Sequence, residues 1–199
     1  MPPKQSLLCK FYAILLCSIQ HYINTKDTSS ANKVLTGFAR LIRKNLEICT
    51  KSYISLEEEL DYLNLYLGLE KKRFGSRFSY TLDIDPQIDK DETMIPSMLL
   101  QPYIENAIWH GIMPKEDGGN VAIKMNLTDP SYLLISIVDD GVGIENSLKT
   151  KKDKHVSKGM DLTQERINLL NQVEVIPIQI EIRQRNSSGT EVSIRVPVH

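Results

Sequence analysis

The segment PYIENAIWHG, Pro102 to Gly111, mixes apolar residues with a carboxylate, an amide and an imidazole. It follows a polar loop at residues 85–96 and predicts a helix that begins near Ser97. A helix that only filled a core would not carry these groups, because each unpaired buried polar group costs about 1–3 kcal/mol. The segment therefore predicts a helix whose polar side chains contact a polar partner.

One face of this helix should be shared by residues spaced three and four apart, namely Leu99, Tyr103, Asn106 and His110. An amide oxygen such as that of Asn106 suits Mg²⁺, and the imidazole of His110 could then contact phosphate. Two plainer interpretations stay open. Asn106 could bond a neighbouring loop, and His110 could cap the end of the helix before Gly111.

A second segment, IVDDGVGI at residues 137–144, runs from a predicted strand into a glycine-rich turn. At a strand end, the carboxylate of Asp139 can accept a hydrogen bond from an adenine amino group. Gly141 and Gly143 would let a flat ligand approach the backbone, because glycine has no Cβ. The sequence DDG is also common in ordinary turns, so this alternative stays open.

Two further segments suggest contacts with phosphate. The lysine-rich loop at residues 145–159 precedes a predicted helix, whose N-terminal amides would attract phosphate, so Lys154 and Gly159 are candidate ligands. Thr190, which opens the last predicted strand with Gly189, is expected to line the same pocket. A solvated loop and a plain hairpin turn are the alternatives.

The rest of the chain predicts an α+β fold. In the first third, Val34, Phe38, Leu41 and Leu46 follow a helical rhythm. The SxxE pattern at Ser55–Glu58 then predicts a capping box that starts a new helix. The apolar face of this helix is broad, so it should pack on both a neighbouring helix and the next domain.

Strand-like alternation replaces the helical pattern after Gly75, which predicts a domain boundary there. Residues 1–75 would form a helical region, and residues 76–199 a mixed sheet with helices on one face. Besides the helix near Ser97, this second part should contain a helix at 157–171 and strands at 78–84, 121–127, 132–138, 176–183 and 191–198.

Composition excludes several classes of function. The chain has 199 residues, of which 41% are hydrophobic, so it can bury a core, and its 24 basic and 25 acidic residues give no bulk charge for nucleic acid. The three cysteines match neither a metal site nor a disulfide framework, which favours the cytoplasm. The apolar stretch Phe11–Ile19 is too short to cross a bilayer, which needs about 20 residues. We expect a buried or amphipathic helix there, with a signal peptide as the alternative.

These segments together resemble the GHKL, or Bergerat-fold, ATP-binding domain. PYIENAIWHG resembles its N box, DDGVGI and SKGMDLTQERI its two glycine boxes, and SGTEVSI its final glycine-threonine element. ARLIRKNLE, ISLEEELDYLNLYLGLEKKRF and IPSMLLQPYIENAIWHG are similar to the LytS/YehU type of sensor histidine kinases. The resemblance implies ATP and Mg²⁺ as ligands. Asn106 would bind the metal, Asp139 would read adenine, Gly141 and Gly143 would shape the pocket, and Gly159 would let a lid reach the phosphates.

The chain departs from this pattern at two places. Ser157 replaces the first glycine of the second glycine box, and Lys10 stands where the family has its acceptor histidine. A lysine, with a pKa of about 10.4, is protonated at neutral pH and cannot replace imidazole as the acceptor. His21 lies on nearly the same helix face but about 16 Å further along the axis. Its use as the acceptor is a hypothesis.

Two functions follow from the resemblance. The first is the catalytic core of a histidine kinase in a two-component phosphorelay, and the alternative is a catalytically silent ATP-binding and dimerisation module. Hydrolysis fits less well, because Pro102 stands where ATP-splitting relatives have their glutamate and Glu105 points about 100° away from Asn106. The implied partners are a second copy of the chain and a response regulator. A membrane anchor is expected only from upstream segments.

Overall fold

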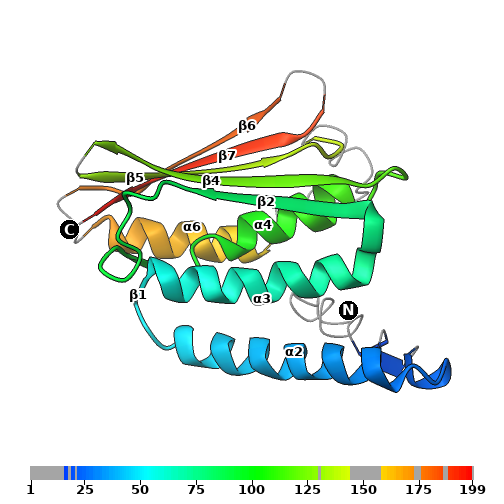
Figure 1. Cartoon of the computed structure of the whole chain (residues 1–199). Coiled ribbons are helices and arrows are strands. Elements are labelled where there is room, and N and C mark those ends of the chain that lie inside the picture. Colours follow the sequence, from blue (N-terminus) through cyan, green and yellow to red (C-terminus); the bar gives the residue numbers. More distant parts are fainter. Residues whose placement is uncertain are drawn as a thin grey trace, which may run out of the picture.

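The computed structural model describes residues 16–17, 19–20, 22–129, 131–143, 158–172, 176–185 and 188–198 (Figure 1). Its helical elements are α2 (Thr28–Ile48), α3 (Leu56–Phe74), the 3₁₀ turn η1 (Gly75–Arg77), α4 (Gln101–Asn106), the π-helical segment η2 (Ala107–Ile112) and α6 (Lys158–Leu170). Its strands are β1 (Tyr53–Ser55), β2 (Phe78–Ile84), β3 (Met94–Pro96), β4 (Gly119–Asp129), β5 (Tyr132–Asp139), β6 (Gln179–Gln184) and β7 (Thr190–Pro197).

Five strands form one mixed sheet in the order β2-β4-β5-β7-β6, with β2 parallel to β4 and the other pairs antiparallel. The helices α3, α4 and α6 lie on the same side of it (Figure 1). Along β5, burial alternates and places Leu133, Ile135, Ile137 and Asp139 on the core side. The predicted α+β fold is confirmed, and Asp139 is the last inward residue of its strand.

Helix α3 starts as predicted, in a capping box. The amide of Glu58 donates to Ser55 Oγ at 3.2 Å, and the amide of Ser55 donates to Glu58 Oε2 at 3.4 Å. Because two free amides at the helix start are paired, the start of α3 is fixed locally.

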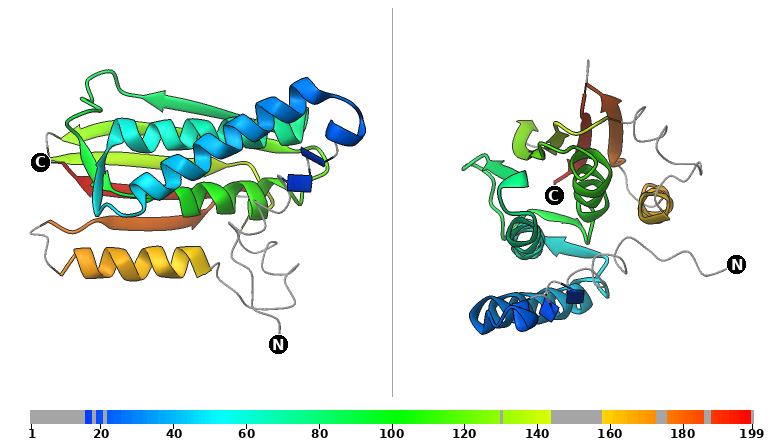
Figure 2. Two further views of the ribbon diagram at one scale, coloured as in Figure 1. Left: turned by 90° about the horizontal axis from the view of Figure 1, so that it is seen from below. Right: turned by 90° about the vertical axis from the view of Figure 1, so that its right-hand side faces the viewer.

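The broad apolar face of α3 packs on two partners, which confirms the prediction. One side contacts α2, which lies on the outside of α3 (Figure 2), and the other faces β2 and the remaining core. Strand β1, which leads into α3, pairs with β3. Helix α3 thus belongs to the same hydrophobic core as the sheet, while the boundary at residue 75 stays a prediction.

The predicted start of the site helix at Ser97 is wrong, since α4 begins at Gln101. Met98 has a φ of 56°, and its amide donates to the buried carboxylate of Glu59 at 3.1 Å, as does the amide of Leu100 at 3.2 Å. Arg166 of α6 donates to the carbonyl of Ser97 at 2.7 Å. These contacts hold residues 97–100 as a turn, and the helix can begin only after it.

Other elements differ from the predictions in smaller ways. Leu46 is 64% exposed although Val34 and Leu41 are buried. It lies five positions after Leu41, so the helix has turned well past one revolution and Leu46 points away from the buried face. Strand β6 begins at Gln179 instead of residue 176, and strand β3 was not predicted at all. Within the part of the chain that the structure describes, no helix has both the length and the apolar character to span a membrane.

The stability of the fold should depend on pH through Glu59. Burial raises the pKa of Glu59 to about 7, although its two amide donors and Arg166 act in the opposite direction. A folded-state pKa above the unfolded value stabilises the fold at low pH, and this contribution is lost as pH rises from about 4.5 through about 7. We expect urea unfolding of the wild type, compared with Glu59→Gln, to show a relative loss of up to about 3 kcal/mol between pH 4.5 and 8. If the free energies of unfolding of the two proteins changed with pH in the same way, the raised pKa of Glu59 would be contradicted.

Candidate functional site

Asp139 ends β5 with its side chain turned into the protein, where it is 3% exposed. Its Oδ1 accepts from the amide of Gly141 at 2.8 Å, and the amide and hydroxyl of Thr190 also donate to the carboxylate. Burial raises the pKa of Asp139, and these three donors partly offset that effect. A carboxylate has about four acceptor sites, so one remains for a further donor.

The turn after Asp139 sits directly on the end of the η2 segment. Val142 donates from its amide to the carbonyl of Gly111 at 2.9 Å, and a Cβ on Gly141 would overlap the Gly111 backbone. A Cβ on Gly111 would in turn lie 2.7 Å from Asp139 Oδ1. Gly141 therefore requires glycine because its backbone meets that of Gly111, and Gly111 leaves the space that the Asp139 carboxylate occupies.

Asn106 is the last residue of α4, immediately before the helix widens into the π-helical turn Ala107–Ile112. Its Nδ2 is buried and has no hydrogen-bond partner among the residues that the structure describes. A buried donor without a hydrogen-bond partner destabilises the fold. A ligand that brings an acceptor would therefore bind favourably at Asn106. The regular spacing used to place His110 on the same face holds only up to Asn106, because π-helical geometry follows.

The structure brings together four of the predicted site residues. Asp139, Gly141 and Thr190 are in contact, and a Cβ on Gly143, which has a φ of 80°, would lie 3.4 Å from the amide nitrogen of Gly189. Asn106 and His110 lie on the helical segment that carries Gly111. Gly159 is in the first turn of α6, which contacts α4. Predictions for Lys10, His21, Lys154 and Ser157 concern residues outside the described ranges.

Sequence reasoning missed the role of Gly111 and the buried polar groups behind Asn106. Glu105 is almost fully buried, accepts from Gln101 Nε2 at 2.6 Å, and has its pKa raised to about 7 by burial. Glu70 on α3 is also buried, and its carboxylate pairs with Arg73. No local pattern marks these residues, although a glycine directly after a polar helix could have drawn attention to Gly111.

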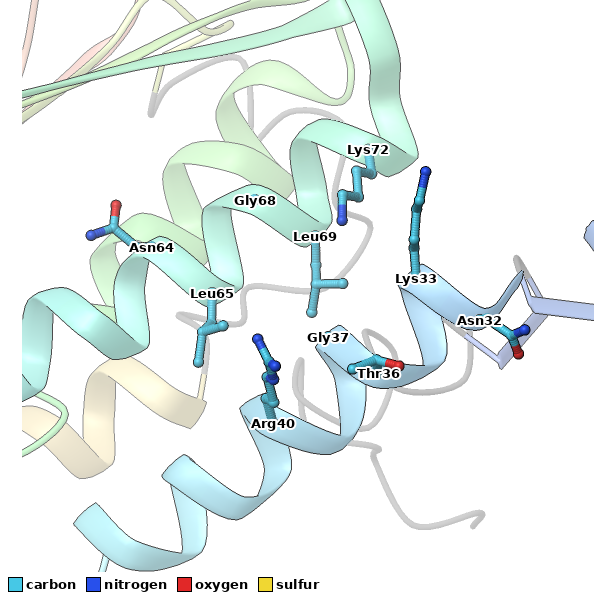
Figure 3. Close-up of a pocket in the computed structure, with 10 residues that line it drawn as sticks. All are labelled: Asn32, Lys33, Thr36, Gly37, Arg40, Asn64, Leu65, Gly68, Leu69 and Lys72. Carbon is cyan, nitrogen blue, oxygen red and sulfur yellow. The ribbon is translucent and has the colours of Figure 1, made fainter. Parts of the chain in front are cut away.

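A groove of about 430 Å³ lies away from these residues, between α2 and α3 (Figure 3). Its charged lining comes from Lys33, Arg40 and Lys72, and its floor contains Gly37 and Gly68. None of the predicted site residues that the structure describes lines it. The groove and the Asp139 site are therefore separate features.

Comparisons with known proteins show which family and fold this chain is similar to. A family model described as histidine kinase matches residues 10–78. Sensor protein LytS of Bacillus subtilis (strain 168) is 30% identical over 180 residues, which cover 86% of this chain and 29% of LytS. The chain therefore spans less than a third of the length of that relative.

Two solved structures share the fold. The histidine kinase domain of the blue-light activated kinase EL346 from Erythrobacter litoralis aligns with a TM-score of 0.53 at 15% identity, covering 98% of this chain and 89% of that one. The histidine kinase ThkA, solved in complex with the response regulator protein TrrA, aligns with a TM-score of 0.50 at 13% identity, covering 97% and 62%.

Gly141→Ala should disrupt the site, because the new Cβ would overlap the Gly111 backbone. We expect the free energy of unfolding to fall by more than about 2 kcal/mol. Gly68→Ala is the matched control, since nothing lies within 4 Å of the added Cβ and Gly68 is inside α3. There we expect a gain of about 0.5–1 kcal/mol. Chemical denaturation measures both, and an unchanged Gly141→Ala protein would refute the close approach.

Proposed function

We propose that this chain, a member of the histidine kinase family related to the LytS-type sensor proteins, is the ATP-binding catalytic core of a two-component phosphorelay. It would bind ATP and Mg²⁺ and transfer the γ-phosphoryl group to a histidine. The observation that carries the proposal is the contact of the Asp139–Gly141 turn with Gly111. This contact joins the strand end that would read a base to the helical segment that carries Asn106.

The base end of the site fits adenine. Asp139 keeps about one acceptor position free after its bonds with Gly141 and Thr190, and the exocyclic amino group of adenine is a donor. Gly141 and Gly143 carry no side chain that could block a flat ring. Thr190 holds the carboxylate in place from the neighbouring strand β7.

The phosphate end fits Asn106. Mg²⁺ takes few protein oxygens and keeps several waters, so Asn106 would hold it together with phosphate and water oxygens. Among the described residues there is no group of three or more His, Cys, Asp or Glu that could hold a metal ion. The unpaired Nδ2 of Asn106 would donate to a phosphate oxygen. Bound Mg²⁺ supplies neutralisation of charge on the phosphates. His110, Lys154 and Gly159 would complete the phosphate contacts.

Phosphoryl transfer then needs a histidine. A lone pair on the imidazole attacks the γ-phosphorus. The bond between the γ-phosphorus and the oxygen that bridges it to the β-phosphate breaks, and ADP leaves. Since Lys10 occupies the expected acceptor place, we propose that the acceptor belongs to another chain. The matches to histidine kinases do not support the catalytically silent alternative, which rests on Lys10 alone.

The proposed partners are a second copy of the chain and a response regulator. Leu35 and Leu46 are exposed on α2, which supports association through this helix. The ThkA structure contains a response regulator bound to a chain with the same fold. We further propose a cytoplasmic location.

Asn106→Ala should remove one metal ligand and weaken Mg²⁺-dependent ATP binding by more than about tenfold. The exposed Asn64 on α3 offers the matched control, because Asn64→Ala removes the same group from the separate groove between α2 and α3. Calorimetric titration with a non-cleavable ATP analogue in magnesium buffer measures both affinities. Equal affinities for the wild type and Asn106→Ala would exclude the metal site.

The acceptor assignment predicts a gain of function. Wild type incubated with γ-labelled ATP should carry little acid-labile phosphate, whereas Lys10→His should become labelled, because imidazole has a free lone pair at neutral pH. Lys10→His combined with Asn106→Ala is the control and should stay unlabelled. Absence of label on Lys10→His, in a protein that binds ATP, would show that residue 10 is not the acceptor place.

A further inference from the structure

A buried polar cluster lies behind the helical segment that carries Asn106. Glu70 of α3 has a fully buried side chain, and its Oε1 accepts from the Tyr66 hydroxyl at 3.2 Å. Its Oε2 accepts from Arg73 at 3.0 Å. Trp109 of η2 makes a further side-chain hydrogen bond with Glu70, in which the indole N–H is the donor. The carboxylate thus links α3 to η2.

Arg73 holds the ring of Trp109 as well. Its guanidinium lies 4.4 Å from the centre of the Trp109 ring and 4.1 Å from the centre of the Phe74 ring. The rings of Phe74 and Trp109 meet edge to face at 6.3 Å. Trp109 is therefore fixed in two ways, through its N–H by Glu70 and through its face by Arg73.

Burying this charged cluster is not expected to stabilise the fold more than apolar packing would. A buried ion pair often contributes no more than apolar residues of similar volume, because both charges lose their hydration. π-Helical turns are also rare and occur mainly at functional sites. Here such a turn starts immediately after Asn106, carries Trp109, and ends in the Gly111 contact with the Asp139 turn.

We propose that Glu70 is a positioning residue that, through Trp109, fixes the π-helical turn and so sets the direction of Asn106. This inference rests on the proposed nucleotide site. Gly111 anchors the far end of η2 on the Asp139 turn, and Trp109 anchors its middle on α3. With both contacts in place, the backbone that follows Asn106 is held in one conformation. Glu70 itself touches neither nucleotide nor metal.

Glu70→Gln tests the proposal, because it keeps the shape of the side chain but removes the charge that pairs with Arg73. We expect the affinity for Mg²⁺·ATP to fall about tenfold, while ATP binding in EDTA, which does not use the metal, stays within about twofold. The emission of Trp109, which is the only tryptophan in the chain, should shift as its hydrogen bond changes. Glu181→Gln is the matched control, since Glu181 forms an exposed ion pair with Arg183 on β6.

A double-mutant cycle separates positioning from a purely structural role. If Glu70 acts through Asn106, Glu70→Gln should lower Mg²⁺·ATP affinity in the wild type but have no further effect in Asn106→Ala. Additive losses in the cycle would overturn the proposal. Trp109→Phe keeps an aromatic ring at this position but removes the indole N–H, so it provides the same test should Glu70→Gln fail to fold.

The outcomes also distinguish this inference from the proposed function. If the wild type binds Mg²⁺·ATP and both Glu70→Gln and Trp109→Phe bind it equally well, the positioning role is refuted and the nucleotide site stands. If the wild type binds no nucleotide, the proposed function fails and the positioning role falls with it.

Discussion

The close approach of two backbones, at Gly111 and Gly141, is the constraint on which the site depends. No side chain fits between them, and the amide of Val142 donates to the Gly111 carbonyl at 2.9 Å. The end of β5 and the end of η2 are therefore held at a fixed separation. Because Asp139 precedes this contact on the strand and Asn106 precedes it on the helix, the same constraint sets how the two side chains relate to each other.

Local patterns were sufficient to predict most of the fold. The alternation in β5 and the capping box at Ser55 and Glu58 could be read from the sequence, since each involves residues a few positions apart. The start of the site helix could not be read in this way. It depends on Glu59, whose carboxylate accepts hydrogen bonds from the amides of Met98 and Leu100, about forty positions further along the chain. Such a contact leaves no periodic signal.

The residues of the candidate site also fall into those that local sequence patterns predict and those that they do not. Asp139 and its glycine turn stand out because a strand ends in an acidic, glycine-rich segment. The cluster of Glu70, Arg73 and Trp109 does not, because EKKRF at the end of α3 has the charge pattern of a solvated surface. Only the contacts of α3 with η2 show that Glu70 and Arg73 are largely buried while Lys71 and Lys72 remain exposed. The π-helical turn is equally hidden, since it depends on contacts at Trp109 and Gly111.

Helix α3 controls both ends of the segment that presents Asn106. Glu59, near its start, holds the turn before α4, and Glu70, near its end, holds Trp109 in η2. The opposite side of α3 contacts α2, where Asn45 donates to the Tyr62 hydroxyl at 3.3 Å. A packed helix moves as a unit and not residue by residue. A displacement of α3 by α2 would therefore act on both ends of the Asn106 segment at once, which links the outer helix mechanically to the end of the site where we propose metal binding.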